Sequence, residues 1–262
     1  MYDRCTVPAL PRGQRLDAHL SRLQNVNGRI TRQEALRATL SVLEQRWLGA
    51  LLRWRSRRVG MSATPSPAPI GRAVCVYCAS SRIAHPDYRA AARRLGEVLA
   101  DEGVGIVYGG GAVGSMGALA DGALARGGRV IGILPRFMAD LEWGHKGLTD
   151  LQLVEDLRTR KHMMLTLSQA AIALPGGSGT LEELLEAITL KRLGLYLNPI
   201  LLVNTRGFFT PLLELLTRAV EERFMDERHL LMWQVVATPE DVPAALADAP
   251  AWSAEARAFA SI

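Results

Sequence analysis

From residue 72 onward, short apolar runs alternate with longer stretches whose apolar residues recur every three or four positions. Short apolar runs predict strands buried on both faces, and the longer spacing predicts amphipathic helices. Strands are expected at 73–78, 105–108, 130–134, 170–174, 200–203 and 235–237. Helices are expected at 86–102, 114–126, 158–169, 181–193, 211–223 and 239–247. This alternation predicts an α/β fold, a Rossmann-like open parallel sheet with helices on both faces.

The first quarter of the chain has a different character. An amphipathic stripe runs from Leu36 to Trp54, preceded by capping-box spacing at Thr31 and Glu34. Residues 1–60 hold twelve Arg and four acidic residues, a net charge of +8, whereas residues 61–262 have a net charge of −3. We expect a basic, largely helical or disordered extension over 1–60, a Pro-rich linker over 61–71 and a folded domain over 72–262.

Charge and composition narrow the choice of partners and compartment. Because the basic excess belongs to the extension, no nucleic-acid partner is expected for the folded domain. A basic membrane-surface or partner-binding helix and a transit peptide remain alternatives for the extension. We favour a dispensable segment, with Met61 as the natural start. No membrane span is expected, and three cysteines in 262 residues favour a reducing, cytoplasmic location.

Two glycine-rich loops follow predicted strands, where open parallel sheets bind their ligands. Gly109–Gly111 precedes the helix expected at 114, and Gly176–Gly179 precedes the helix expected at 181. Glycine lets the backbone approach an anion, and a helix start offers free N–H groups. Tight structural turns are the alternative for both loops. Thr180 and Glu183 have capping-box spacing, so Glu183 could simply cap its own helix.

Other candidate residues carry weaker signals. Arg160 and Lys161 are adjacent cations at an expected helix start, where they oppose the helix dipole. An anionic substrate would explain them, and a solvated surface pair is the alternative. His145 lies in an expected loop without metal-ligand spacing around it. Cys75 and Cys78 fall on an expected strand whose alternation points them apart, so neither a redox pair nor a metal site is expected.

The glycine-rich blocks together resemble a known family. Pro175–Glu183 matches the Pro-Gly-Gly-x-Gly-Thr-x-x-Glu signature of the Lonely Guy family of cytokinin riboside 5′-monophosphate phosphoribohydrolases. The resemblance runs from about residue 73 to 224 and includes Tyr108–Gly111, Met116–Gly117, Cys78–Ser81, Glu142–Thr149 and Arg160–Lys161. It implies a hydrolase that cleaves the N-glycosidic bond of a cytokinin nucleotide or AMP, giving free base and ribose 5-phosphate. It also implies a homodimer that needs no metal or cofactor.

The resemblance carries residue roles with it. Arg160 and Glu183 correspond to the family's catalytic pair. The implied substrate contacts are Ser81, Gly110, Gly111, Glu142, Arg160, Lys161, Gly177, Ser178, Gly179, Thr180, Leu181, Glu182, Glu183 and Thr189. Leu190 and Arg192 depart from the Trp and Gln of many members, which leaves the choice between cytokinin and adenine open. The main alternative is a non-catalytic nucleotide-binding or carrier protein of the same fold. A pyridoxal-dependent decarboxylase ranks behind, because none of the three lysines has a recognisable cofactor setting.

Overall fold

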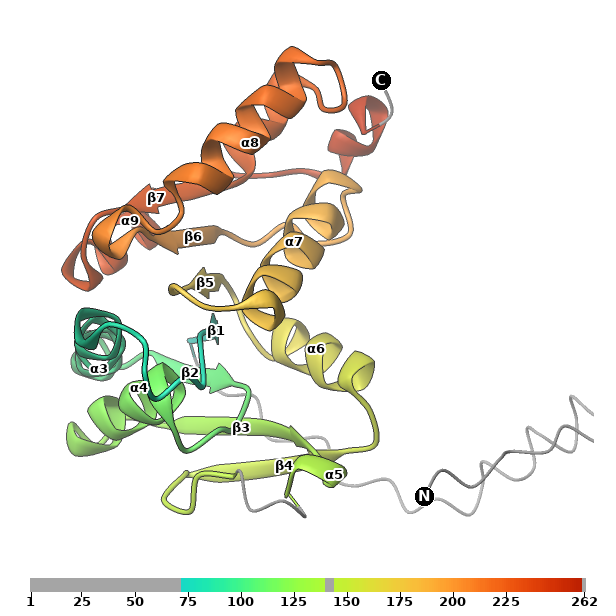
Figure 1. The fold of residues 1–262 in the computed structure, drawn as a ribbon. Coiled ribbons are helices and arrows are strands. Elements are labelled where there is room, and N and C mark those ends of the chain that lie inside the picture. The colour runs from blue at the N-terminus through green and yellow to red at the C-terminus, as the bar shows by residue number, and fades with distance from the viewer. Residues whose placement is uncertain (1–71, 140–143, 261–262) are drawn as a thin grey trace, which may run out of the picture. The chain divides into compact units, whose positions relative to one another are not determined.

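A computed structural model describes residues 72–139 and 144–260 (Figure 1). The extension and linker predicted for 1–60 and 61–71 therefore lie outside the described residues, and so does Glu142. Those three predictions stay predictions.

The described chain forms one parallel sheet of seven strands in the order β4-β3-β2-β1-β5-β6-β7. The strands are β1 (Ala73–Tyr77), β2 (Gly105–Tyr108), β3 (Val130–Pro135), β4 (Asp150–Val154), β5 (Ala171–Ala173), β6 (Ile200–Val203) and β7 (Gln234–Val236). Every neighbouring pair is parallel, with Tyr77 of β1 opposite Ala173 of β5. The sheet confirms the predicted α/β class.

Helices cover both faces of this sheet (Figure 1). The α-helices are α3 (Pro86–Asp101), α4 (Gly114–Ala125), α5 (Arg136–Ala139), α6 (Leu157–Thr166), α7 (Ser178–Arg192), α8 (Thr210–Glu221) and α9 (Val242–Ala247). Short 3-10 helices are η2 (Thr205–Gly207), η3 (Glu227–Met232), η4 (Pro239–Asp241) and η5 (Ala254–Phe259). The connections between strands are helical because parallel neighbours need a long crossover.

Two apolar cores lie on opposite faces of the sheet. One packs Met164 of α6, Leu184 of α7 and Leu216 of α8 against strand residues such as Cys75. The other packs helices α3, α4 and α9 against the side of the sheet that carries Cys78. Strand alternation thus separates the two cysteines, which are free and buried. The expectation that they do not form a redox pair agrees with this placement.

Most expected elements appear within one to three residues of their predicted ends, but one strand is new. β4 falls in a region predicted to be a long loop. It is an edge strand whose Asp150 and Gln152 alternate with the half-exposed Leu151 and Leu153. A strand with one neighbour and one partly solvated face has no continuous apolar run, so the search for buried strands missed it.

The strand order reverses between β1 and β5, and this reversal defines where a ligand can enter. The chain winds outward from β1 through β2 and β3 to β4, then returns to β5 and winds the other way to β7. Loops that leave the carboxyl ends of β1 and β5 therefore diverge onto opposite faces and open a crevice between them. The residues that follow β1, β2 and β5 meet at this edge.

Candidate active site

Arg160 is a buried cation at the carboxyl edge of the sheet. It belongs to α6, and only 8% of the residue is exposed. Its Nε donates to the carbonyl of Ile133 at 3.1 Å, and its Nη2 donates to the carbonyl of Gly109 at 3.4 Å. Two main-chain carbonyls thus orient a planar group with five fixed donors. The alternative of a solvated surface cation is excluded for Arg160.

An acidic N-cap at the start of α6 offsets the positive charges of the cations in its first turns. Asp156 is the N-cap, and its carboxylate accepts the N–H of Thr159 at 2.7 Å. Hydrogen bonds from Thr159 hold the pKa of the Asp156 carboxyl below its ordinary value. This negative charge at the N-cap offsets the unfavourable position of cations near the positive end of the helix dipole.

Glu183 faces Arg160 from the neighbouring helix. It lies in α7 with 6% of the residue exposed, and its Oε1 is 3.5 Å from Nη1 of Arg160. Burial raises the pKa of Glu183, and the positive charge of Arg160 offsets part of that rise. The two residues predicted to be a catalytic pair are twenty-three positions apart in sequence and are brought together from two successive helices.

The capping interpretation of Glu183 is wrong. Helix α7 begins at Ser178, three residues earlier than expected, and its N-cap is Gly177. Thr180 and Glu183 are then the third and sixth residues of the helix, both buried. Because a capping box needs its first residue at the N-cap, the Thr-x-x-Glu spacing here does not form one.

The first turn of α7 is open to solvent. Gly177, Ser178 and Gly179 are exposed, and no atom lies within 4 Å of a Cβ built on either glycine. Just before them, a Cβ on Gly176 would lie 2.2 Å from Oγ1 of Thr180. Free N–H groups and the positive end of the helix dipole therefore face open space at the switch point. Such a helix start accepts an anion.

The glycine loop after β2, unlike the loop before α7, is hydrogen-bonded within the protein. Three successive carbonyls of this loop each accept a hydrogen bond from the protein itself. Gly109 accepts from Arg160, Gly110 from the backbone N–H of His145 at 2.9 Å, and Gly111 from the hydroxyl of Tyr108 at 3.1 Å. This loop therefore holds Arg160 in place, and the substrate contacts expected at Gly110 and Gly111 stay predictions.

Lys161 is paired with carboxylates. Its Nζ bonds to Glu182, and Glu186 lies 2.9 Å away. Partial burial alone would lower the pKa of Lys161, but the two carboxylates outweigh it and raise the pKa. Any phosphate that reaches Lys161 must share it with these glutamates.

The remaining predicted contacts lie apart from the buried pair. Ser81 is exposed in the connection between β1 and α3, with its carbonyl against the start of α4 at Gly114. Leu181 packs onto the core below α7. Thr189 lies about 9 Å beyond Glu183 along α7. Its hydroxyl donates to the Leu185 carbonyl at 2.8 Å, so the structure does not bring it to the buried pair.

Sequence reasoning missed the groups that orient Arg160. The carbonyls of Ile133 and Gly109 are main-chain atoms, which every residue has, so no side-chain signal marks them. Asp156 could have been found, because an acidic residue just before a helix is a recognised N-cap signal.

Within residues 72–139 and 144–260, no group of three His, Cys, Asp or Glu side chains is arranged to hold a metal ion. The fold and the site define an open α/β protein with a solvent-exposed helix start and a buried Arg–Glu pair at its switch point.

Comparison with known proteins identifies the family. Residues 116–246 match a family described as "Possible lysine decarboxylase". A rice protein (Oryza sativa subsp. japonica) named "Probable cytokinin riboside 5′-monophosphate phosphoribohydrolase" is 41% identical over 174 residues, covering 65% of this chain and 70% of its own. The cytokinin riboside 5′-monophosphate phosphoribohydrolase of Rhodococcoides fascians is 40% identical over 166 residues, 63% of this chain and 83% of its own. The chain belongs to this family, the Lonely Guy family.

Solved structures support the fold alone. A molybdenum cofactor binding protein from Rippkaea orientalis is similar with a TM-score of 0.51 at 22% identity, covering 66% of this chain and 93% of its own. The molybdenum cofactor carrier protein from Chlamydomonas reinhardtii reaches 0.52 at 20% identity, over 67% and 96%.

The decarboxylase description does not fit the lysines of this chain. Pyridoxal chemistry needs a lysine amine free to form a Schiff base. Lys161 is held by two carboxylates, and Lys191 is buried at the far end of α7 with its amine 2.7 Å from the Asn198 carbonyl. Lys146 is exposed in the connection before β4.

Proposed function

We propose that this protein hydrolyses the N-glycosidic bond of a nucleoside 5′-monophosphate, releasing the free base and ribose 5-phosphate. The substrate class is a cytokinin nucleotide or AMP. The observation that carries this proposal is the buried Arg160–Glu183 pair, 3.5 Å apart beside the open start of α7. The names of the relatives at 40–41% identity support it.

The helix start supplies the anchor for the substrate. The 5′-phosphate would accept N–H groups from Gly177–Gly179, where added volume would meet no protein atom. Anchoring the phosphate at one end of ribose places the glycosidic carbon at a fixed distance from α7. Glu183 lies more than one turn further along that helix, which suits a group that acts on the sugar.

Glu183 would act in its ionised form. Glycosidic cleavage develops positive charge on the sugar ring, and a nearby carboxylate stabilises that charge or takes a proton from the attacking water. The water oxygen ends on the sugar, and the departing base nitrogen gains a proton. The positive charge of Arg160 would favour the ionised form of the buried Glu183 carboxyl. The remaining N–H donors of Arg160 can hold a substrate oxygen.

The test is base release from AMP and from isopentenyladenosine monophosphate, followed by chromatography. We expect release from at least one nucleotide. Glu183→Gln keeps the shape but not the charge, so turnover should disappear while nucleotide binding survives. Glu240→Gln is the matched control, because this exposed carboxylate pairs with Arg94 on the other face of the sheet.

The outcomes separate the alternatives. Binding of both nucleotides without release would favour a carrier or binding protein. A Glu183→Gln variant that keeps its turnover would refute the catalytic role. The ratio of kcat/KM for the two nucleotides decides between cytokinin and adenine as the preferred base.

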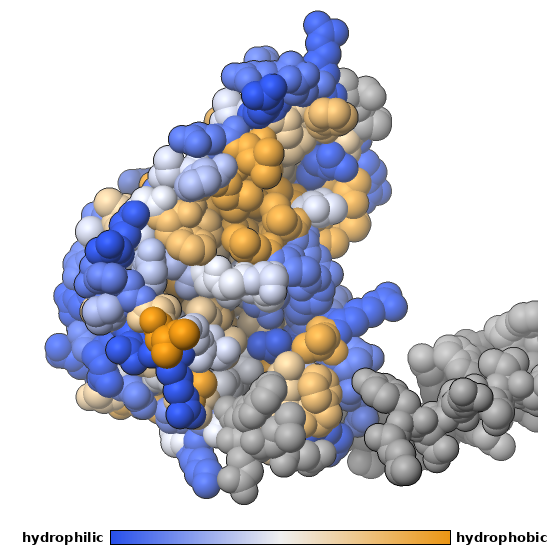
Figure 2. Space-filling model, viewed as in Figure 1, coloured by the Kyte–Doolittle hydropathy of each residue, from blue (hydrophilic) through white to orange (hydrophobic). Residues whose placement is uncertain are grey.

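We also propose that the protein is a cytoplasmic homodimer. Apolar side chains gather on the face between α7 and α8 (Figure 2), and Leu185, Leu195 and Leu215 are exposed. Patches of this kind often mark protein interfaces.

Free cysteines support a reducing compartment. None of the helices in the described part of the chain is long and apolar enough to cross a membrane. Light scattering on the purified protein measures the dimer, and cell fractionation measures the location.

A further inference from the structure

We propose that His145 is a positioning residue for the reaction, holding the β2 glycine loop so that Gly109 presents its carbonyl to Arg160. This inference rests on the proposed function. It is carried by two sets of contacts: the imidazole of His145 bonds to Gly147 and Asp121, and its backbone N–H bonds to Gly110, the neighbour of the glycine whose carbonyl accepts from Arg160.

The backbone of His145 is joined directly to the loop. Its N–H donates to the carbonyl of Gly110 at 2.9 Å, and Gly144 forms an antiparallel bridge with Gly111. Gly110 has φ of +77°, a conformation that glycine adopts without strain. The segment beginning at Gly144 thus lies along the loop and fixes its course.

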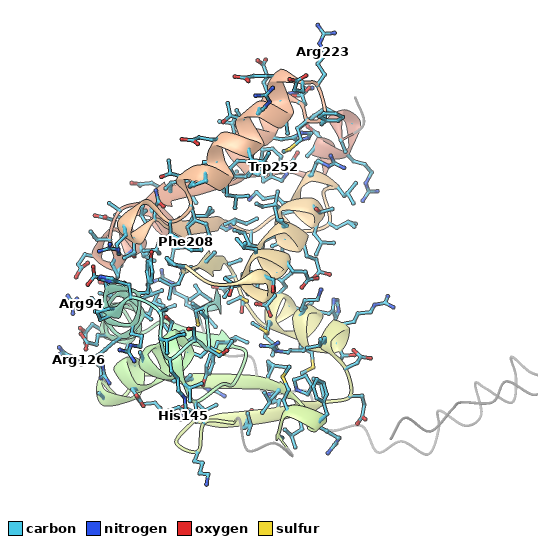
Figure 3. All side chains as sticks on the ribbon, in the orientation of Figure 1. Arg94, Arg126, His145, Phe208, Arg223 and Trp252 are labelled. Atoms are coloured by element: carbon cyan, nitrogen blue, oxygen red, sulfur yellow. The ribbon has the colours of Figure 1, made fainter. Side chains whose placement is uncertain are left out.

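The imidazole fixes that segment in turn. Its Nδ1 accepts the N–H of Gly147 at 3.0 Å, so the ring proton sits on Nε2, which donates to Asp121 of α4 at 3.1 Å. Only 12% of the side chain is exposed, and Figure 3 shows His145 against the lower part of the fold beside α4. One side chain therefore closes its own turn and ties that turn to a helix.

A displacement of the glycine loop would change the position of the Arg160 guanidinium directly, whether or not substrate is bound. The Gly109 carbonyl is 3.4 Å from Nη2, and there is no room for even a Cβ between Gly109 and the guanidinium. If the loop moved, Arg160 would lose one of its two carbonyl partners and could rotate relative to Glu183. Ile133 would still hold Nε, so we expect a partial loss.

This role predicts a particular division between kcat and KM. The proposed phosphate anchor is the start of α7, whereas the hydrogen bonds of His145 go to Gly110, Gly147 and Asp121. We therefore expect His145→Ala to lower kcat about ten-fold by misplacing Arg160. KM should stay within about two-fold of the wild-type value, since uniform binding is retained. If the glycine loop instead cradles the substrate, KM rises.

Two conservative variants separate the two bonds of the ring. His145→Asn places an amide oxygen near the position of Nδ1 and can accept from Gly147, but it is too short to reach Asp121. His145→Gln can reach Asp121 but offers no acceptor at the Nδ1 position. Each should retain more kcat than His145→Ala. Arg93→Ala is the matched control, because Arg93 is the other partner of Asp121, at 3.6 Å, and should leave kcat unchanged.

Hydrogen exchange of the backbone amides keeps this test independent of the reaction. His145→Ala should speed exchange in the peptide that spans residues 105–116, and Arg93→Ala should not. Equal exchange in the two variants, an unchanged kcat or a raised KM would overturn the role of His145. If the wild-type protein releases no base, the proposed function fails, and exchange alone still decides whether His145 holds the loop.

Discussion

Gly109→Ala tests the close approach on which the Arg160 site depends. The added Cβ would lie 1.9 Å from Nη2 of Arg160 and 3.1 Å from its Cζ. Unbonded heavy atoms pack at about 3.5 Å or more, so the guanidinium would have to retreat by roughly 1.5 Å. It cannot retreat freely, because its Nε is bound to Ile133 and the residue is buried.

A displacement of that size has two measurable costs. Misplacement of a catalytic group by about 1 Å can reduce a rate about 100-fold, so we expect kcat for base release to fall at least that far. Loss of a hydrogen bond to a buried charged group should lower the free energy of unfolding by about 1–3 kcal/mol. Steady-state kinetics and urea denaturation measure the two effects separately.

Gly96→Ala provides the matched control. Its Cβ would lie 2.2 Å from the carbonyl of Leu119, where α3 and α4 cross on the opposite face of the sheet. We expect lower stability with a near wild-type kcat when the assay temperature is well below the unfolding midpoint. Should Gly109→Ala keep the wild-type kcat, or lose activity only in proportion to unfolding as Gly96→Ala does, the steric reasoning is refuted.

Two further predictions concern ionisation. Since burial raises the pKa of Glu183 above its ordinary value of 4.5, base release should decline on acidification with a midpoint above pH 4.5, and a midpoint at or below that value would contradict its role as a buried carboxylate. Burial lowers the pKa of Lys191 from 10.5 to about 8, which disfavours its charged form in the folded state by about 3 kcal/mol near neutral pH. Lys191→Met should therefore be more stable than wild type at pH 7 by less than this amount, because a hydrogen bond is also lost, and the advantage should shrink as pH rises from about 8 to 10.5. Urea denaturation across this pH range measures the difference in free energy of unfolding between Lys191→Met and wild type. A difference that does not change with pH would be evidence against the burial of a charge.

Much of the fold could be read from the sequence because its strands are central ones. The apolar runs 105–108 and 200–203 became strands with the predicted bounds, since burial on both faces leaves a continuous signal. β4 was missed for the opposite reason, as an edge strand with polar residues on alternate positions. Its Leu151 nevertheless packs near Gly110, so the edge strand contributes to the floor of the glycine loop.

The class of fold, the two glycine loops and the residue types of the candidate pair could be predicted from local periodicity and short motifs. The contacts that each group makes depend on how distant segments pack together. Arg160 is buried and donates to two main-chain carbonyls, and Glu183 faces it instead of capping α7. The carbonyls of the β2 loop accept hydrogen bonds from the protein itself. These outcomes depend on contacts between segments far apart in the chain. Every residue has a main-chain carbonyl, and the burial of a charge depends on distant contacts, so the local sequence predicts neither.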